Sequence, residues 1–278
     1  RSSYPCNEDL TLSGFCKKIL DAKNQEIQSL KKSGAFSLYK RQALLIPLPP
    51  SFHDAIRVPQ NRVALIGELK RKSPSHGTFN EDIEMSRRVA EFEKAGISAV
   101  SMVIDSAFYG GNVEDLLAVA QTTPLPLLCK DYIVDPIQLY RARAFGSSAV
   151  HLPCSLLDKE RLRALVRVSH ELSLEPVIEV RSTSEVGRAL GTSARMISVN
   201  SRNLDTLTLD PLLPGRILQR LPESVVRIVQ GEIHTREQVK TWVMMGFDAC
   251  VVGGPLSSCD NVEETVAGLI PDDLPENY

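Results

Sequence analysis

The sequence predicts an α/β protein, a (β/α)8 TIM barrel with an extra N-terminal helix. Apolar runs alternate eight times with segments of helical spacing, and the repeat occupies about 200 residues, the size expected of such a barrel. The runs are rich in Val and Ile and continuously apolar, as in parallel strands that are buried on both faces. A doubly wound open sheet is the alternative. It normally carries a Gly-rich phosphate turn after its first strand, and this sequence has no such turn.

The segment before the first strand contains one predicted helix. Apolar residues recur at roughly helical spacing over 11–33, with Lys and Glu between them, which indicates an amphipathic helix. Residues 44–62 are rich in proline and are expected to form a connector. We therefore expect a loose N-terminal tail over 1–11, a single barrel domain over 12–270, and a C-terminal tail over 271–278.

Eight strand–helix units follow in regular order. The predicted strands are 63–70, 98–104, 126–131, 149–152, 176–180, 196–200, 225–229 and 249–254. The predicted helices are 83–95, 113–121, 135–145, 158–172, 182–190, 211–220, 235–245 and 261–269. Several of these helices end next to a glycine, which is typical of a helix C-cap.

Composition excludes several classes of function. The net charge of -2 argues against a generic nucleic-acid-binding protein, since such domains are usually strongly basic. No apolar run approaches the ~20 residues that span a bilayer, and the N-terminus lacks the features of a signal peptide. The six cysteines form no C-x-x-C pair and no zinc spacing. We therefore expect a cytoplasmic protein with no nucleic-acid partner, no membrane partner, no metal and no other cofactor.

Polar residues gather where the predicted strands end. They are Glu68 and Lys70, Asp105, Lys130 and Asp131, Glu179, Asn200 and Arg202, Gln230 and Glu232, and Gly253-Gly254. In a barrel the carboxyl ends of the strands meet at one mouth, which carries the active site. We therefore favour an active site at this mouth. The alternative is that these residues are solvated strand ends.

The residue types indicate proton transfer at this mouth. Burial lowers the pKa of a lysine and a nearby carboxylate raises it, so Lys70 and Lys130 are candidate acids. Glu68 and Glu179 are candidates for exchanging protons at carbon or nitrogen.

Phosphate binding is the second chemistry that the mouth suggests. Gly253-Gly254 offers backbone N–H groups to a phosphate, with a tight turn as the alternative. Arg202 can supply a guanidinium.

The remaining polar residues are assigned other roles. Asp105 and Asp131 are expected to cap loops. His151 and His234 can each act as a base, but a structural or solvated role is favoured, because no Ser or Cys nucleophile is suggested beside them.

Five motifs occur in order along the chain. They are Glu68-Leu69-Lys70-Arg71-Lys72-Ser73-Pro74-Ser75, Phe108-Tyr109-Gly110-Gly111, Lys130-Asp131-Tyr132-Ile133, Pro176-Val177-Ile178-Glu179-Val180 and Asn200-Ser201-Arg202-Asn203-Leu204. Together they resemble the indole-3-glycerol phosphate synthase family. The resemblance extends from about residue 12 to residue 270 and includes the extra N-terminal helix of that family.

The resemblance implies a metal-free lyase of tryptophan biosynthesis, which acts as a monomer or homodimer on a phosphorylated, anthranilate-derived small molecule. The reaction converts 1-(2-carboxyphenylamino)-1-deoxyribulose 5-phosphate to indole-3-glycerol phosphate, with loss of carbon dioxide and water. By position, Lys130 is the general acid, Lys70 is a second acid near the phosphate, Glu68 and Glu179 exchange protons, and Asn200 hydrogen-bonds the substrate. The implied binding residues are Ser73, Arg202, Gly253 and Gly254 on the phosphate side, Tyr109 and Tyr132 in the aromatic pocket, and Gln230 and Gly231.

The chain departs from the family pattern after the seventh predicted strand. The usual Ser-Glu-Ser-Gly-Ile is matched by Val229-Gln230-Gly231-Glu232-Ile233. Gln230 cannot carry the charge of the usual glutamate. A carboxylate at position 232 would repel a phosphate unless it turns away or is paired. Three alternatives stay open: a synthase with a repositioned phosphate loop, a paralogue that closes a related ring in specialised metabolism, and a non-catalytic ligand-binding homologue.

Overall fold

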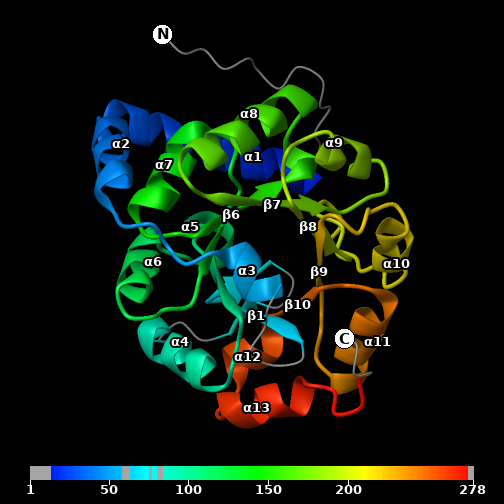
Figure 1. Cartoon of the computed structure of the whole chain (residues 1–278). Helices are drawn as coiled ribbons and strands as arrows, with labels where there is room; N and C mark the ends of the chain where they lie inside the picture. Colours follow the sequence, from blue (N-terminus) through cyan, green and yellow to red (C-terminus); the bar gives the residue numbers. More distant parts are fainter. Residues whose placement is uncertain (1–13, 58–62, 75–76, 80–83, 275–278) are drawn as a thin grey trace.

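Eight parallel strands close into a barrel in the computed structural model, which describes residues 14–57, 63–74, 77–79 and 84–274. The strands are β1 (Ala64–Leu69), β4 (Ala99–Val103), β5 (Leu127–Lys130), β6 (Ala149–Pro153), β7 (Glu175–Val180), β8 (Met196–Asn200), β9 (Val226–Gln230) and β10 (Ala249–Val252). Around the barrel the order is β1, β10, β9, β8, β7, β6, β5, β4, and β1 closes the ring by pairing with both β4 and β10. The predicted (β/α)8 barrel is confirmed, and Figure 1 shows the helices around it.

The helices begin and end close to the predicted residues in most units. They are α1 (Gly14–Lys32), α2 (Ala35–Leu45), α3 (Phe52–Arg57), α4 (Met85–Lys94), α5 (Ser106–Tyr109), α6 (Val113–Ala120), α7 (Pro136–Ala144), η1 (Cys154–Leu156), α8 (Lys159–Glu171), α9 (Val186–Leu190), α10 (Leu213–Leu218), α11 (Arg236–Met245), α12 (Gly254–Ser258) and α13 (Val262–Leu269). After β1, the short strands β2 (Lys72–Ser73) and β3 (Gly77–Thr78) pair as an antiparallel hairpin.

Two of the predicted helices are shorter than expected. The helix predicted over 182–190 begins only at Val186, because the residues before it form a turn. In that turn the Glu185 carboxylate accepts the backbone N–H of Arg181 at 2.6 Å. The helix predicted over 211–220 extends from Leu213 to Leu218.

Side chains alternate between the barrel interior and the surrounding helices along each strand. On β1, Ala64 and Ile66 pack in the interior cluster, whereas Leu65 packs in the cluster toward the helices. Glu68, two residues beyond Ile66, therefore points inward at the carboxyl end of its strand. The same spacing of two brings polar side chains to the mouth from the other strands.

Helix α3 closes the amino-terminal opening of the barrel, and in Figure 1 it lies over the centre of the ring. Phe52 and Ile56 are buried among the interior side chains of the strands. Glu175, at the start of β7, accepts the backbone N–H groups of Phe52 and His53 at 2.6 and 2.9 Å, which satisfies donors that the first turn of a helix leaves free. The prediction of a connector throughout 44–62 is wrong, because α3 forms after the prolines at 47, 49 and 50. Residues 58–62 lie outside the described part.

Helix α1 lies over the carboxyl ends of β4 and β5, as the predicted extra helix. Lys23 is 2% exposed, and its ammonium lies 2.8 Å from Asp105 Oδ1 and 2.6 Å from Asp131 Oδ1. Arg141 of α7 lies 3.1 Å from the second oxygen of Asp131. A buried network of ion pairs therefore fixes α1 to the rim that carries the mouth. The predicted tail over 1–11 lies outside the described residues.

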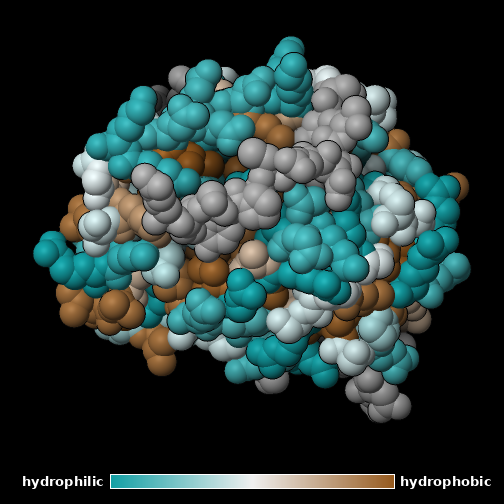
Figure 2. Space-filling model, turned by 90° about the horizontal axis from the view of Figure 1, so that it is seen from above, coloured by the Kyte–Doolittle hydropathy of each residue, from teal (hydrophilic) through white to brown (hydrophobic). Residues whose placement is uncertain are grey.

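Helix α2 lies in a segment for which the sequence predicts no helix. It packs on α7 through two aromatic pairs, Phe36 with Tyr140 and Tyr39 with the adjoining Phe145, whose ring centroids lie 5.3 and 6.0 Å apart. Its last residues expose apolar surface, since Leu44 is 81% exposed. Figure 2 shows apolar areas among hydrophilic surface on the side of the molecule where α2 lies.

The described part of the C-terminal tail packs against α11. Asp272 and Asp273 form ion pairs with Arg236 and Lys240 of that helix, and Leu274 is buried. Among the described residues, no helix combines the length and the apolar character that crossing a membrane requires.

Candidate active site

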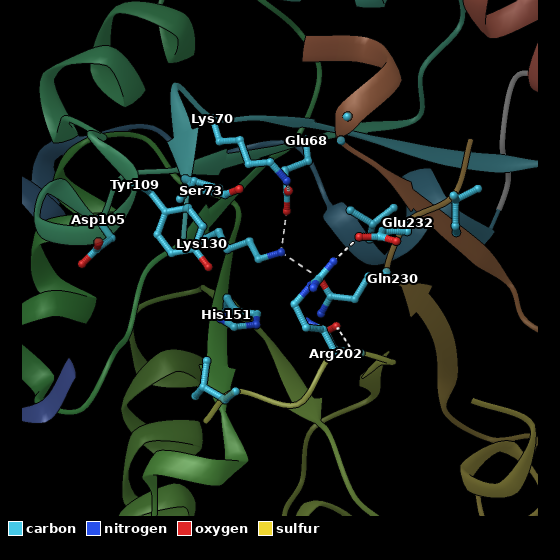
Figure 3. Close-up of a pocket in the computed structure, with 18 of the residues that line it drawn as sticks. Glu68, Lys70, Ser73, Asp105, Tyr109, Lys130, His151, Arg202, Gln230 and Glu232 are labelled. Carbon is cyan, nitrogen blue, oxygen red and sulfur yellow. Dashed lines mark hydrogen bonds and ion pairs between the residues drawn. The ribbon is translucent and has the colours of Figure 1, made fainter. Parts of the chain in front are cut away.

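The carboxyl ends of the strands surround one cavity, and all predicted site residues except Glu179 line it. The lining residues among them are Glu68, Lys70, Ser73, Tyr109, Lys130, Tyr132, Asn200, Arg202, Gln230, Gly231, Gly253 and Gly254. They come from strands far apart in the sequence, because inward positions converge where the strands end. Figure 3 shows Lys130 between Glu68 and Gln230 in this cavity.

Lys130 and Glu68 form the centre of the site. Lys130 Nζ donates to Glu68 Oε2 at 2.5 Å and to Gln230 Oε1 at 2.7 Å. Lys70 Nζ donates to the other oxygen, Glu68 Oε1, at 2.7 Å. Each oxygen of Glu68 therefore binds one ammonium group, and Lys130 is held at two points.

Charge pairing fixes the resting protonation of these groups. Burial alone would raise the pKa of Glu68, but the ammonium groups of Lys130 and Lys70 hold it far below its usual range. Burial alone would lower the pKa of Lys130, whereas the charges of Glu68 and Glu179 raise it. The resting site therefore holds an ionised Glu68 beside a protonated Lys130, which can donate a proton.

Glu179 lies behind the wall of the cavity and is 1% exposed. Its Oε1 accepts from Arg181 Nε at 2.6 Å. Its Oε2 accepts from Asn200 Nδ2 at 2.9 Å and from Gln230 Nε2 at 2.6 Å. Burial alone would raise the pKa of Glu179, but the positive charge of Arg181 and the contact with His151 hold it well below its usual range. Glu179 is thus an ionised carboxylate that the wall residues contact directly.

Arg181 is a site residue that the sequence analysis missed. It lines the cavity, and its Nη1 donates to the backbone oxygen of Arg202 at 2.6 Å. It therefore ties the end of β7 to the loop after β8. The signal was present in the sequence, because Arg181 follows Glu179 by two residues and so shares its inward face.

His151 belongs to the wall of the site. It is buried on β6 and lines the cavity. Its Nε2 lies 3.2 Å from Glu179 Oε2, without hydrogen-bond geometry, and its Nδ1 lies 3.4 Å from the Asp131 backbone oxygen. The expectation of a structural or solvated residue therefore misses its contact with the site. His234 is exposed at the mouth, which agrees with the expected solvated role.

Two aspartates close the loops after β4 and β5, as predicted. Asp105 Oδ2 accepts the backbone N–H of Phe108 at 2.7 Å, and Asp131 Oδ1 accepts that of Tyr132 at 2.8 Å. These caps set the position of an aromatic wall. The hydroxyl groups of Tyr109 and Tyr132 lie 3.4 Å apart, and Phe15 of α1 supports this wall through an edge-on contact with Phe108 at 5.0 Å.

Close packing explains the glycine after β10. A Cβ at Gly253 would lie 2.9 Å from Glu68 Oε1 and 3.1 Å from Lys70 Nζ. Its φ of -114° requires no glycine. A side chain at this position would therefore have to displace the charged Glu68–Lys70 pair, so close packing rather than a tight turn accounts for the glycine.

The loop after β9 places Glu232, one of the departures from the family pattern, in strained backbone. Gly231 has a φ of 121° and Glu232 a φ of 48°, a region that favours glycine. The Glu232 carboxylate forms an ion pair with Nη2 of Arg202 across the mouth. The carboxylate is therefore paired, which is one of the two ways in which it could avoid repelling a phosphate.

Within 14–57, 63–74, 77–79 and 84–274, no group of three His, Cys, Asp or Glu residues is placed to hold a metal ion. The chemistry available to these side chains is proton transfer by lysines and carboxylates, together with binding of an anionic ligand.

Comparison with known proteins agrees with this geometry. The family model described as indole-3-glycerol phosphate synthase matches residues 16–269. An indole-3-glycerol phosphate synthase from Staphylococcus haemolyticus is 34% identical over 216 residues, which cover 78% of this chain and 82% of the relative. One from Saccharopolyspora erythraea is 31% identical over 254 residues, which cover 91% and 94%.

Solved structures agree in fold. A 3-hexulose-6-phosphate synthase from Salmonella typhimurium superposes with a TM-score of 0.58 at 14% identity, covering 74% of this chain and 96% of that one. An N-acetylmannosamine-6-phosphate 2-epimerase from Clostridium perfringens gives 0.57 at 16% identity, covering 79% and 96%. At such identities the likeness concerns the fold alone. The family model and the sequence relatives carry the assignment, and the chain belongs to the indole-3-glycerol phosphate synthase family.

Proposed function

We propose that this chain catalyses the ring closure of 1-(2-carboxyphenylamino)-1-deoxyribulose 5-phosphate to indole-3-glycerol phosphate, a carboxy-lyase step of tryptophan biosynthesis. Family membership supports the reaction. The observation that carries it is the placement of Lys130, a protonated amine held between Glu68 and Gln230 at the centre of the cavity.

The overall conversion defines what the residues must do. The aryl carbon that bears the carboxyl group bonds to the carbonyl carbon of the deoxyribulose, whose oxygen takes up a proton and becomes a hydroxyl. The carboxyl group then leaves as carbon dioxide and its electron pair restores the ring. The hydroxyl finally leaves as water with one further proton, and loss of a proton from the former C1 completes the indole.

The three charged residues at the centre of the site, Lys130, Glu68 and Lys70, suit these proton transfers. Lys130 is the general acid that protonates the carbonyl oxygen, since its ammonium is oriented by two acceptors and faces the cavity. Glu68 accepts the proton lost from the former C1 and returns a proton to Lys130 through their direct contact, and Lys70 on its other oxygen supplies the second acid. A positioned acid or base of this kind contributes about 10²–10⁴-fold to a rate.

Glu179 takes the second carboxylate role through its neighbours. It orients the Asn200 amide, which lines the cavity and hydrogen-bonds the substrate. A proton reaches or leaves Glu179 through His151, whose ring contacts it, while Arg181 stays protonated and holds the carboxylate in place.

The ends of the substrate are matched by the two sides of the cavity. Tyr109 and Tyr132 face the aromatic ring. The phosphate lies toward Lys70 and Arg202, near three residues with little or no side chain: Ser73, Gly253 and Gly254. The described cysteines are all free, which supports a cytoplasmic enzyme, acting as a monomer or homodimer.

A direct assay tests this function. Purified protein is incubated with 1-(2-carboxyphenylamino)-1-deoxyribulose 5-phosphate while indole absorbance is recorded, with release of carbon dioxide measured in parallel. Appearance of both products at equal rates is expected. The Lys130→Ala protein, prepared in the same way, controls for a contaminating synthase.

The departures after β9 favour a second candidate, a paralogue that closes a related ring on an altered substrate. The specific observation is that Gln230 replaces a carboxylate and Glu232 adds one at the mouth. Such a paralogue would turn over the ordinary substrate poorly and a substrate with a different anionic end well. A non-catalytic homologue would bind anthranilate-like ligands without any turnover.

A further inference from the structure

Every Lys and Arg side chain that lines the described cavity is already paired with a carboxylate of the protein. Lys70 and Lys130 contact Glu68. Arg181 contacts Glu179, and Arg202 contacts Glu232. An anionic ligand therefore gains a cation in this cavity only by sharing or displacing one of these carboxylates.

The pairs differ in how firmly they are held. The Glu68 side chain is 8% exposed and binds two ammonium groups, and the Glu179 side chain is 1% exposed with amide donors in addition to Arg181. The Glu232 side chain, in contrast, is 33% exposed. Breaking a fully buried ion pair is strongly destabilising because it leaves an uncompensated buried charge, whereas a pair nearer the solvent, such as Glu232 with the 19% exposed Arg202, is less costly to separate. The pair of Glu232 with Arg202 is therefore the one that yields most readily.

Arg202 keeps its position without Glu232. Its Nη1 donates to the Leu207 backbone oxygen at 2.5 Å, and its own backbone N–H donates to Asn200 Oδ1 at 3.0 Å. The guanidinium therefore remains at the mouth when its partner leaves.

The backbone of Glu232 is anchored as well. Its oxygen accepts from Gln238 Nε2 at 3.3 Å, and Gln238 also accepts the His234 backbone N–H at 2.7 Å. Gln238 belongs to the capping box that begins α11. Only the side chain of Glu232 has to move.

We propose that Glu232 is a specificity-determining residue, an internal counter-anion that the substrate's phosphate displaces from Arg202. This inference rests on the proposed function and deepens it. A phosphate monoester carries about -1.5 to -2 charges at neutral pH, so it outcompetes a single carboxylate for the guanidinium. A dephosphorylated analogue lacks the charge to do so and meets an occupied site. The wild type therefore binds its substrate less tightly than a chain without Glu232, but it discriminates between ligands by their charge.

Inorganic phosphate is the probe that tests the exchange without turnover. Its affinity is measured by titration calorimetry at low ionic strength for the wild type, Glu232→Gln and Glu232→Gly. The control is Glu237→Gln, an exposed carboxylate of α11 that does not line the cavity. We expect both Glu232 variants to bind phosphate on the order of tenfold more tightly than the wild type, because they remove the competing charge, and the control to match the wild type.

Steady-state kinetics give the second measurement. The KM for the phosphorylated substrate should fall on the order of tenfold in Glu232→Gln with kcat within about threefold, since uniform binding alone changes. Equal phosphate affinity in the wild type and both variants, or no measurable phosphate binding by any of them, overturns the proposal. If the wild type and the variants bind phosphate as expected but none of them closes the indole ring, the displacement of Glu232 from Arg202 is supported and the proposed reaction is not.

Discussion

Arg181 Nε lies 2.6 Å from Glu179 Oε1, so a buried carboxylate of the site is held by a guanidinium two residues further along the chain. The same guanidinium reaches the backbone of Arg202 through Nη1. One side chain therefore sets both the charge of Glu179 and the position of the loop that carries Arg202.

Replacement of Arg181 by Gln tests the electrostatic part of this relationship. The wild-type pKa of Glu179 is held well below its usual range by Arg181 and His151 against the effect of burial. Loss of the guanidinium removes stabilisation of the ionised form, so the pKa rises. If ionised Glu179 is required, the acid limb of the kcat profile moves to higher pH, and kcat at neutral pH falls about tenfold or more.

The measurement is a pH–rate profile of Arg181→Gln beside Arg181→Lys and Arg167→Gln. Lys keeps the charge and should restore most of the acid limb. Arg167 is 72% exposed on α8, and its loss should leave the profile unchanged. A drop in kcat with an unmoved acid limb would mean that Arg181 only supports the loop.

Lys130→Ala tests the general acid. Its ammonium donates to one side-chain acceptor on Glu68 and one on Gln230, and its removal should lower kcat about 10²–10⁴-fold. The fold should persist, because Glu68 keeps Lys70 on its other oxygen. Circular dichroism and thermal unfolding check the fold, and ring closure is followed by indole absorbance. A Lys130→Ala enzyme that retains ordinary activity would remove Lys130 from the acid role.

The double variant Gln230→Glu with Glu232→Gly restores the family pattern at both positions. We expect kcat/KM for the phosphorylated substrate to rise on the order of tenfold, with the gain coming from Glu232→Gly, which removes a competing charge and relieves positive-φ backbone. Gln230→Glu alone should not help. The Gln230 amide donates to Glu179 at 2.6 Å, and a second carboxylate there would have to share a proton with it.

A mutant cycle with both single variants separates the two contributions. No gain from Glu232→Gly, or a loss, would favour the paralogue that acts on a substrate without this phosphate geometry.

The barrel was predictable because its signal is repeated eight times. Each buried run has the β-branched, apolar character of a parallel strand, so an error at one helix boundary leaves the topology unchanged. Helix α3 was hidden because its helical residues, Phe52–Arg57, lie in a proline-rich stretch that reads as a connector. Tertiary contacts identify α3: Phe52 and Ile56 fill the barrel interior, and Glu175 of β7 caps the first turn of the helix.

The convergence of the site was predictable from strand ends, and its contacts were not. A spacing of two from Glu179 points to Arg181 as an inward residue, so that omission could have been avoided. No pattern in the sequence states that Glu232 reaches Arg202, because this depends on the φ of 48° at a residue that rarely adopts it. Nor does it state that Glu179 lies behind the wall, where Asn200 and Gln230 donate to it and Arg181 pairs with it.

Lys23→Met should destabilise the protein more than any surface change on α1. The variant keeps the apolar stem but leaves Asp105 and Asp131 buried without the ammonium that lies 2.8 and 2.6 Å from them. Breaking one side of a buried ion network costs about 3–5 kcal/mol of unfolding free energy. The matched control is Lys17→Met on the exposed face of α1, which should change stability by less than about 0.5 kcal/mol.

The destabilisation caused by Lys23→Met should depend on pH, and its direction follows from the pKa values of the buried aspartates. In the wild type, burial opposes ionisation of Asp131, but Lys23 and Arg141 lower its pKa. Its stabilising contribution is therefore present above the unfolded-state value of about 3.9 and lost as pH falls through the lower folded-state value. In Lys23→Met, burial raises the pKa of Asp105 and Asp131, because the Lys23 ammonium no longer offsets it. The two carboxylates are then protonated as the pH falls, which removes the free-energy cost of burying their charges. Urea unfolding, monitored by Trp242 fluorescence, should show a stability gap between wild type and variant that narrows from pH 7 toward about pH 4. A gap of constant size across this range would show that lost packing of the lysine stem, rather than unpaired charge, causes the destabilisation.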